Sequence, residues 1–310
     1  MSNYSILFPG QGSQTIGMMD AFANNTIIKE TFEEASQILK KDFWAMVSQD
    51  NADIHKTVNT QPVMLVSGIA IWRLLKKNGL NRPKFLAGHS LGEFSALVAA
   101  EVLEFGDALI IVSKRANLMQ SAVPEGVGAM AAILGLEDSK VIEICNNVDS
   151  SEVMDAVNFN SPGQVVIAGH RSLIEASLDD FKRAGAKRAL LLPVSVPSHC
   201  ELMKTAADEF EAFLDSKNFN KPTLSVLHNV DFKTYNNETN IKDALVRQLY
   251  NPVQWTKSIE YIANQNISTF IEVGPGKVLT GLNKRINKEL KSYSTDNLEA
   301  LEKTIEMIKG

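Results

Sequence analysis

The stretch FLAGHSLGEF, residues 85–94, decides which fold the sequence predicts. Its centre, GHSLG at 88–92, matches G-x-S-x-G, the pattern of a serine held on a sharp turn between a strand and a helix. An apolar strand is predicted before the turn, over 84–89, and a helix of small and apolar residues after it, over 91–100. Glycines flank Ser90 because so tight a turn leaves no room for neighbouring Cβ atoms, and the helix N-terminus beyond it favours negative charge. The stretch therefore predicts Ser90 to be a nucleophile.

Short apolar runs alternate with helical patterns along the rest of the chain, which favours an α/β architecture with a parallel sheet. Besides the elements around Ser90, the patterns predict strands over 4–8, 223–229 and 269–273, helices over 61–78, 106–121, 199–217 and near 241–264, and a last pair of helices at the end.

The middle of the chain changes character. Its patterns predict the order β-α-β-β-α-β, with strands over 127–134, 153–159, 164–168 and 187–193 and helices over 137–147 and 172–184. This order is that of a ferredoxin-like unit. We therefore expect a small subdomain at 126–195, inserted into a larger core formed by 1–125 and 196–310.

Composition excludes several classes of protein. The chain has 310 residues, is 45% hydrophobic and carries a net charge of −5, which does not fit the basic footprint of a nucleic-acid binder. No stretch approaches the roughly 20 apolar residues that span a bilayer, and the start, MSNYSILFPG, lacks the features of a signal peptide. Its two cysteines, Cys145 and Cys200, have no CxxC spacing, so neither a disulfide framework nor a metal site is predicted. We expect a cytoplasmic globular protein without a metal.

A serine hydroxyl needs a general base at neutral pH, and the chain has five histidines. His199, in PVSVPSHCEL, stands where the inserted segment returns to the core. The surrounding sequence alone leaves open whether His199 is the base or only a neighbour of a helix start. Its neighbour Cys200 is expected to be a small buried hydrophobe rather than a nucleophile. The other four are predicted as exposed (His55, His170), as a structural or lining residue that points away from Ser90 (His89), and as a core or site-rim residue (His228).

A second glycine-rich loop follows the first predicted strand, in LFPGQGSQTIG at 7–17. A strand that runs into such a loop also occurs where a Rossmann domain holds a pyrophosphate. After Gly10 and Gly12, however, the third glycine of G-x-G-x-x-G would fall at position 15, which is Thr15. This departure weakens the nucleotide interpretation.

Taken together, the motifs are similar to those of the malonyl-CoA:acyl carrier protein transacylase family of fatty acid synthesis. The matching pieces run in order over nearly the whole chain: FPGQGSQ (8–14), TQP (60–62), GHSLGE (88–93), SKRANLMQ (113–120), NFNSPGQVVIAG (158–169), VSVPSH (194–199), NPVQW (251–255) and EVGPGKVL (272–279). The resemblance implies an α/β-hydrolase-like core interrupted by a ferredoxin-like subdomain, in agreement with the insertion predicted above.

The resemblance also implies a role for particular residues. His199 would be the base of Ser90, and Arg115 would bind the free carboxylate of the malonyl group. The glycine-rich loop would then hold no nucleotide, because it would supply one of two oxyanion-hole amides. The remaining implied roles are backbone N–H groups of the oxyanion hole (Gln11, Leu91), the backbone carbonyl that orients the histidine (Gln248), support of the carboxylate (Gln61) and pocket lining (Asn160).

The implied activity is transfer of malonyl from malonyl-CoA to the phosphopantetheine thiol of acyl carrier protein, by a ping-pong mechanism through a malonyl-serine. The coenzyme A thioester would be a substrate, with no permanently bound cofactor, and we expect a monomer. Basic clusters at 182–188 and 284–291 could dock the acidic carrier protein, although a solvated charged surface is the favoured explanation for either cluster.

Three other functions stay open on the sequence. A serine esterase or thioesterase of the α/β-hydrolase class would place its histidine late in the chain, whereas the last histidine here is His228. An acyltransferase of polyketide synthesis would share the same motifs. A non-catalytic carrier-binding module is disfavoured by the presence of Ser90, His199 and Arg115.

Overall fold

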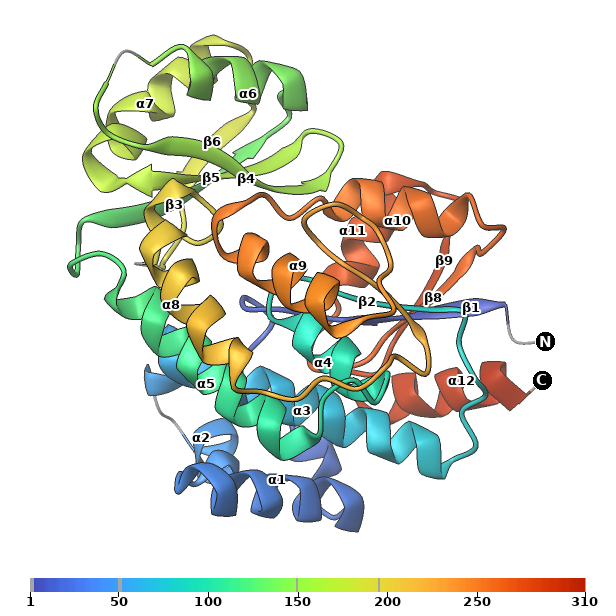
Figure 1. The fold of residues 1–310 in the computed structure, drawn as a ribbon. Helices are drawn as coiled ribbons and strands as arrows, with labels where there is room; N and C mark the ends of the chain where they lie inside the picture. Colours follow the sequence, from blue (N-terminus) through green and yellow to red (C-terminus); the bar gives the residue numbers. More distant parts are fainter. Residues whose placement is uncertain (1–2, 50–51, 149, 195, 310) are drawn as a thin grey trace.

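The computed structural model describes residues 3–49, 52–148, 150–194 and 196–309. A parallel sheet lies in the middle of the molecule, and a smaller antiparallel sheet with its own two helices lies at one end (Figure 1). The predicted fold class is therefore confirmed.

The main sheet has the strand order β7-β2-β1-β8-β9, and each neighbouring pair is parallel. Its middle strand, β1, has all five residues buried, as expected of a strand covered on both faces. Successive side chains of β1 point to opposite faces, so Ile6 and Phe8 join one apolar cluster and Leu7 joins another. The strands are β1 (Tyr4–Phe8), β2 (Phe85–Gly88), β7 (Ser225–Leu227), β8 (Thr269–Glu272) and β9 (Lys291–Ser294).

Helices cover both faces of this sheet (Figure 1). The long helix α3 is apolar almost all round, because it packs against α1, α4 and α5 as well as the sheet. The helices of the core are α1 (Thr26–Leu39), α2 (Phe43–Ser48), α3 (Thr57–Lys77), α4 (Gly92–Ala99), α5 (Phe105–Ser121), α8 (Lys204–Asp215), α9 (Glu238–Tyr250), α10 (Trp255–Ala263), α11 (Val278–Ile286) and α12 (Leu298–Lys309), with short 3-10 turns at Asp20–Phe22, Ala52–His55 and Glu201–Met203. Among the helices of the described residues, none has the length and apolarity needed to cross a membrane.

The smaller sheet has the order β4-β5-β3-β6 with every neighbouring pair antiparallel. Its first and third strands in the chain are central, and α6 and α7 pack on one face through an apolar cluster of their own. The other face packs on the core, where Met130 and Ala168 surround Cys200. The elements are β3 (Gly128–Leu134), α6 (Asp138–Asn146), β4 (Met154–Ser161), β5 (Gln164–His170), α7 (Arg171–Arg183) and β6 (Arg188–Leu191).

Some predicted elements differ from the structure. The end of the chain was predicted as two helices only, but β9 lies between α11 and α12 and pairs with β8 at the sheet edge. Its sequence, KSYS, has no apolar run, because an edge strand is only partly covered. The helix predicted over 199–217 starts later, at Lys204, after a short 3-10 turn. The proposed domain limits stay a prediction, and one of them, at Ser195, lies outside the described residues.

Backbone atoms of β1, β2 and α4 come very close together below Ser90. A Cβ added to Gly92 would lie 2.1 Å from the carbonyl oxygen of Phe8, and one added to Gly88 would lie 1.9 Å from the carbonyl carbon of Gly92. Both contacts are with backbone, which has little freedom to move away. The glycines of the G-x-S-x-G pattern are therefore required by packing.

We predict that Gly88→Ala destabilises the fold by about 3 kcal/mol or more, or prevents folding, because a methyl group has no space there. Gly281→Ala is the matched control, since a Cβ at this position in α11 meets nothing within 4 Å and alanine favours helix. Thermal unfolding of both variants checks this. A Gly88→Ala protein as stable as the Gly281→Ala protein would contradict the packing requirement.

Candidate functional site

Ser90 follows the C-terminal end of β2 and has φ +50°, a left-handed backbone that residues with a side chain rarely adopt. His199 also has a left-handed backbone, with φ +69°, and its N–H donates to the carbonyl oxygen of Leu249 at 2.9 Å. Although these residues are 109 positions apart, Ser90 Oγ lies 2.8 Å from His199 Nε2. Two unusual backbone positions thus bring a hydroxyl and an imidazole into hydrogen-bonding contact.

The other ring nitrogen of His199 fixes the imidazole. Its Nδ1 lies 2.6 Å from the backbone carbonyl oxygen of Gln248, which can only accept a hydrogen bond. Nδ1 therefore carries the proton and Nε2 is left to accept one from Ser90. Burial lowers the pKa of His199 to about 3, with the positive charge of Arg115 as the second cause. The ring is consequently neutral at pH 7 and has the form a general base needs.

Arg115 enters the site from α5 and is 1% exposed. Its Nη1 donates to Gln61 Oε1 at 2.6 Å, and its Nη2 donates to Gln248 Oε1 at 2.8 Å and to Ser90 Oγ at 3.3 Å. Its Nε is buried without a hydrogen-bond partner in the described part of the chain. Burial lowers the pKa of Arg115 to about 10, which still leaves the guanidinium charged at pH 7.

Gln11 and Leu91, the two residues predicted to supply oxyanion-hole amides, line the same cavity from different loops. Gln11 belongs to the glycine-rich loop after β1, and Leu91 immediately precedes α4. Within the described ranges, neither amide donates to another group of the protein. Gly10 lets the loop approach, since a Cβ there would lie 2.4 Å from the carbonyl oxygen of His89.

The cavity has a volume of about 800 Å³ and lies between the core and the smaller sheet. Asn160, predicted to line it, is hydrogen-bonded through Oδ1 to His89 Nε2 at 2.8 Å, and the residue of the same strand that lines the cavity is Asn158. The lining residues are Gln11, Gly12, Gln14, His55, Gln61, His89, Ser90, Leu91, Arg115, Met119, Met130, Asn158, Leu192, Pro193, Val194, Val196, Ser198 and His199.

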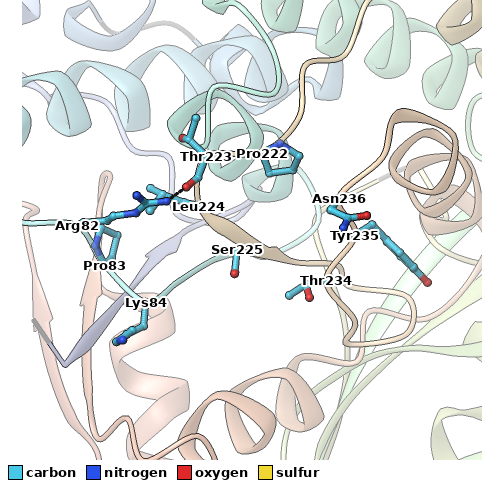
Figure 2. Close-up of a pocket in the computed structure, with 10 residues that line it drawn as sticks. All are labelled: Arg82, Pro83, Lys84, Pro222, Thr223, Leu224, Ser225, Thr234, Tyr235 and Asn236. Carbon is cyan, nitrogen blue, oxygen red and sulfur yellow. Dashed lines mark hydrogen bonds between the residues drawn. The ribbon is translucent and has the colours of Figure 1, made fainter. Parts of the chain in front are cut away.

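Figure 2 shows a different cavity, of about 570 Å³, at the opposite end of the main sheet where β2 and β7 begin. Arg82 there donates to the carbonyl oxygen of Thr223. The walls of this cavity contain no histidine and none of the predicted site residues. It is therefore separate from the site around Ser90.

The structure also places the other four histidines. His55 is exposed as predicted, at the cavity wall. His89 lines the cavity, and its Nε2 bonds to Asn160 rather than to Ser90. His228 is fully buried, with Nδ1 2.7 Å from Glu93 Oε1. His170 was predicted to be exposed, but it is half-buried at the end of β5 because its Nδ1 accepts from the Val153 N–H at 2.8 Å.

Sequence analysis missed two buried residues that hold the site together. Asn229 accepts from the Ser90 N–H at 2.6 Å and donates to the Gly88 carbonyl at 2.7 Å, so it fixes the turn from both sides. Glu93 is fully buried and accepts from the Asn229 N–H at 2.9 Å and from Gln248 Nε2 at 2.8 Å. A lone acid in the apolar stretch GEFSALVA, and an asparagine at the C-terminal end of a parallel strand, were the available signals.

No group of three or more His, Cys, Asp or Glu side chains in the described residues is arranged to hold a metal ion. Cys200 is fully buried against the smaller sheet, as expected, and burial raises the pKa of its thiol to about 12. A fully buried thiol with so high a pKa is a poor nucleophile at neutral pH.

Comparisons with known proteins agree with this geometry. The family model for the acyl transferase domain matches residues 6–302, which makes the chain an acyltransferase by class. The malonyl CoA-acyl carrier protein transacylase of Escherichia coli (strain K12) is 52% identical over 309 residues, covering 99% of this chain and all of the relative. That of Staphylococcus aureus (strain MW2) is 43% identical over 302 residues, covering 96% and 97%.

Two solved structures are also similar. An acyl carrier protein S-malonyltransferase from Vibrio cholerae superposes with a TM-score of 0.95 at 50% identity, covering 98% of this chain and all of that one. A malonyl-transacylase in complex with a type II PKS acyl-carrier protein superposes with a TM-score of 0.97 at 46% identity, covering 99% and 100%. The chain belongs to the malonyl-CoA:acyl carrier protein transacylase family, so the resemblance seen in its motifs is confirmed.

Proposed function

We propose that this chain transfers a malonyl group from malonyl-CoA to the phosphopantetheine thiol of an acyl carrier protein, in two half-reactions through a malonyl ester of Ser90. Family membership supports a malonyl-CoA:acyl carrier protein transacylase of fatty acid synthesis. One observation carries the rest of the proposal: Ser90 Oγ lies 2.8 Å from His199 Nε2 and 3.3 Å from Arg115 Nη2. A nucleophile, a base and a cation for the malonyl carboxylate thus meet in one cavity.

In the first half-reaction, His199 Nε2 accepts the hydroxyl proton as Ser90 Oγ attacks the thioester carbonyl carbon. The resulting oxyanion is stabilised by the backbone N–H groups of Gln11 and Leu91, two residues that line the cavity and whose backbone amides have no hydrogen-bond acceptor among the described residues. Loss of one such donor typically lowers the rate by about 10²–10³. The C–S bond then breaks, coenzyme A leaves with the proton from His199, and malonyl remains on Ser90.

In the second half-reaction, the carrier-protein thiol gives its proton to His199 and its sulfur attacks the ester carbonyl. The same two amides stabilise the second oxyanion. The C–O bond breaks, Ser90 Oγ recovers the proton from His199, and malonyl leaves as the carrier-protein thioester. Each half-reaction returns His199 to its neutral form.

A serine and a histidine suffice here because of the leaving group. The carbonyl oxygen of Gln248 orients the ring without adding a negative charge. A thiol with a pKa near 8.5 departs far more readily than an amine, so less assistance from a third residue is needed. When His199 takes up the proton, it becomes a cation beside Arg115, and a malonyl carboxylate on Arg115 offsets this repulsion.

Selectivity for malonyl is assigned to Arg115. Its buried guanidinium is held in place by Gln61 and Gln248, and its Nε–H has no acceptor within the described part of the chain. A carboxylate that accepts from such a planar group gains charge-assisted hydrogen bonds that a lysine would not reproduce. By fixing the acyl group, Arg115 also keeps the ester carbonyl placed for the incoming thiol.

The carrier protein is expected to be acidic, and this chain is acidic as a whole. Docking is therefore assigned to a local basic surface of the chain. In the 182–188 cluster, two of the four basic residues, Lys182 and Arg183, already pair with Asp179 and Asp180, and only Lys187 and Arg188 lack an ion pair to another described residue. In the 284–291 cluster, no ion pair to another described residue engages Lys284 or Lys288. The second cluster is the better candidate. A cytoplasmic, monomeric state remains a prediction.

Two alternatives remain to be distinguished. A thioesterase of the same fold class would use a late histidine backed by Asp or Glu, whereas the ring here is oriented by a backbone carbonyl. An acyltransferase serving a polyketide carrier protein keeps specific support, because one similar structure is a complex with a type II PKS acyl-carrier protein.

Transfer rather than hydrolysis should dominate. With malonyl-CoA and a phosphopantetheinylated fatty-acid carrier protein, we expect malonyl carrier protein to form much faster than free malonate. Liquid chromatography with mass detection measures both products, and an unmodified carrier protein without the thiol arm is the control. If free malonate forms faster than malonyl carrier protein even when the thiol is present, the thioesterase alternative is favoured. A preference for a polyketide carrier protein would favour the second alternative.

Arg115→Ala should lower kcat/KM for acylation by malonyl-CoA about 10²-fold while acylation by acetyl-CoA is retained or increased, because only malonyl needs a cation. Arg115→Lys keeps the charge without the planar donors and should recover only part of the loss. Rapid-quench acylation with each thioester provides the rates. An unchanged malonyl preference in Arg115→Ala would refute the assigned role.

A further inference from the structure

The carboxylate of Glu93 is fully buried on α4, one turn below the reacting groups, and the proposed mechanism does not use it. Its Oε1 lies 2.7 Å from His228 Nδ1. Its Oε2 accepts from the Asn229 N–H at 2.9 Å and from Gln248 Nε2 at 2.8 Å. A buried carboxylate with this many hydrogen bonds is held in one orientation. It also fixes the orientation of the groups that bond to it.

Gln248 can satisfy its neighbours in only one orientation of its amide. Glu93 Oε2 and the Ser90 carbonyl oxygen, at 2.8 and 3.1 Å, both require the NH₂ group to face them. Arg115 Nη2 can only donate, so the amide oxygen must face it, as it does at 2.8 Å. A flipped amide would place its oxygen against Glu93 Oε2 and the Ser90 carbonyl oxygen, and its NH₂ group against the guanidinium of Arg115.

This orientation matters for Arg115 because the guanidinium rests on two amide oxygens, Gln61 Oε1 at 2.6 Å and Gln248 Oε1 at 2.8 Å. If the Gln248 amide turned over, Nη2 would lose its acceptor and meet a donor. The guanidinium would then shift from its place 3.3 Å from Ser90 Oγ. Glu93 therefore affects the substrate indirectly: it orients Gln248, and Gln248 positions Arg115.

We propose that Glu93 is a positioning residue for acyl selection: it holds the Gln248 amide with its oxygen toward Arg115 and so keeps the guanidinium placed for the malonyl carboxylate. This inference rests on the proposed function, because it assigns Glu93 to the same selection of malonyl. It adds a residue that never touches the acyl group.

Two substitutions separate the effect of the hydrogen bonds that Glu93 accepts from the effect of its negative charge. In Glu93→Gln, the new amide oxygen still accepts from Asn229 and Gln248, and its NH₂ can donate to His228 Nδ1. His228 tolerates this because its Nε2 has no partner in the described chain and can take the ring proton. Glu93→Met has a similar length but accepts nothing, so it removes the shortest hydrogen bond of the Gln248 NH₂ group and leaves the amide held only by the Ser90 carbonyl oxygen and Arg115.

The readout is the ratio of acylation rates with malonyl-CoA and acetyl-CoA, measured by rapid quench and intact mass at a temperature where each variant is folded. We expect Glu93→Met to lower this ratio about tenfold or more, and Glu93→Gln to keep it within about threefold of wild type. A purely structural role would reduce both rates equally. An unchanged ratio in Glu93→Met, or an equal loss in Glu93→Gln, would overturn the proposal.

Two further variants complete the experiment. Glu272→Gln alters another buried carboxylate, which caps α11 through Leu279 and Thr280, so it should lower stability without changing the ratio. Gln248→Met should lower the ratio as much as Glu93→Met, and combining the two should add little. If Glu93→Met does not fold, an unchanged ratio in Gln248→Met still refutes the proposal.

Failure of the inference is distinguishable from failure of the proposed function. Absence of a malonyl adduct on the wild-type protein would refute the proposed function. A wild-type protein that is malonylated with the expected preference, together with Glu93→Met and Gln248→Met variants that keep this preference, would refute the inference alone.

Discussion

The hydrogen bond between Ser90 Oγ and His199 Nε2, at 2.8 Å, is the contact on which the proposed chemistry depends. Both residues have positive φ, a backbone state that costs about 1–3 kcal/mol and persists only where the surroundings enforce it. At Ser90, the surroundings are the close approach of Gly88 and Gly92 and the two hydrogen bonds of Asn229. At His199, they are hydrogen bonds to α9. Two of the six non-glycine residues with positive φ among the described residues are therefore the two whose side chains meet in the site.

Burial sets the electrostatics of the same contact. Arg115 and His199 are both buried, and the charge of the guanidinium opposes protonation of the imidazole. The free protein therefore keeps a neutral imidazole beside a guanidinium whose Nε has no hydrogen-bond partner among the described residues. Under the proposed function, a substrate that brings its own carboxylate would supply an acceptor for Arg115 and a negative charge near the developing imidazolium. Recognition and chemistry are coupled by this shared charge.

Local patterns predicted much of the fold, because strands such as β1 and helices such as α3 are buried enough to show in the sequence. The turn at Ser90 was equally visible, since its glycines are demanded by backbone contact. The residues alone left the base undecided, because pairing Ser90 with His199 is a long-range property, and the family resemblance was needed to choose it. Asn229, Glu93 and the Gln248 side chain escaped notice because their roles arise only where three elements meet. The polar edge strand β9 carried no apolar signal.

The most direct test of the central claim is the intact mass of the protein after brief exposure to malonyl-CoA, followed by peptide mapping. The account predicts a single added malonyl group of about 86 Da on the peptide containing Ser90, formed by wild type and absent from Ser90→Ala. An adduct of the same mass that persists in Ser90→Ala, or that maps to another residue in the wild-type protein, would contradict it.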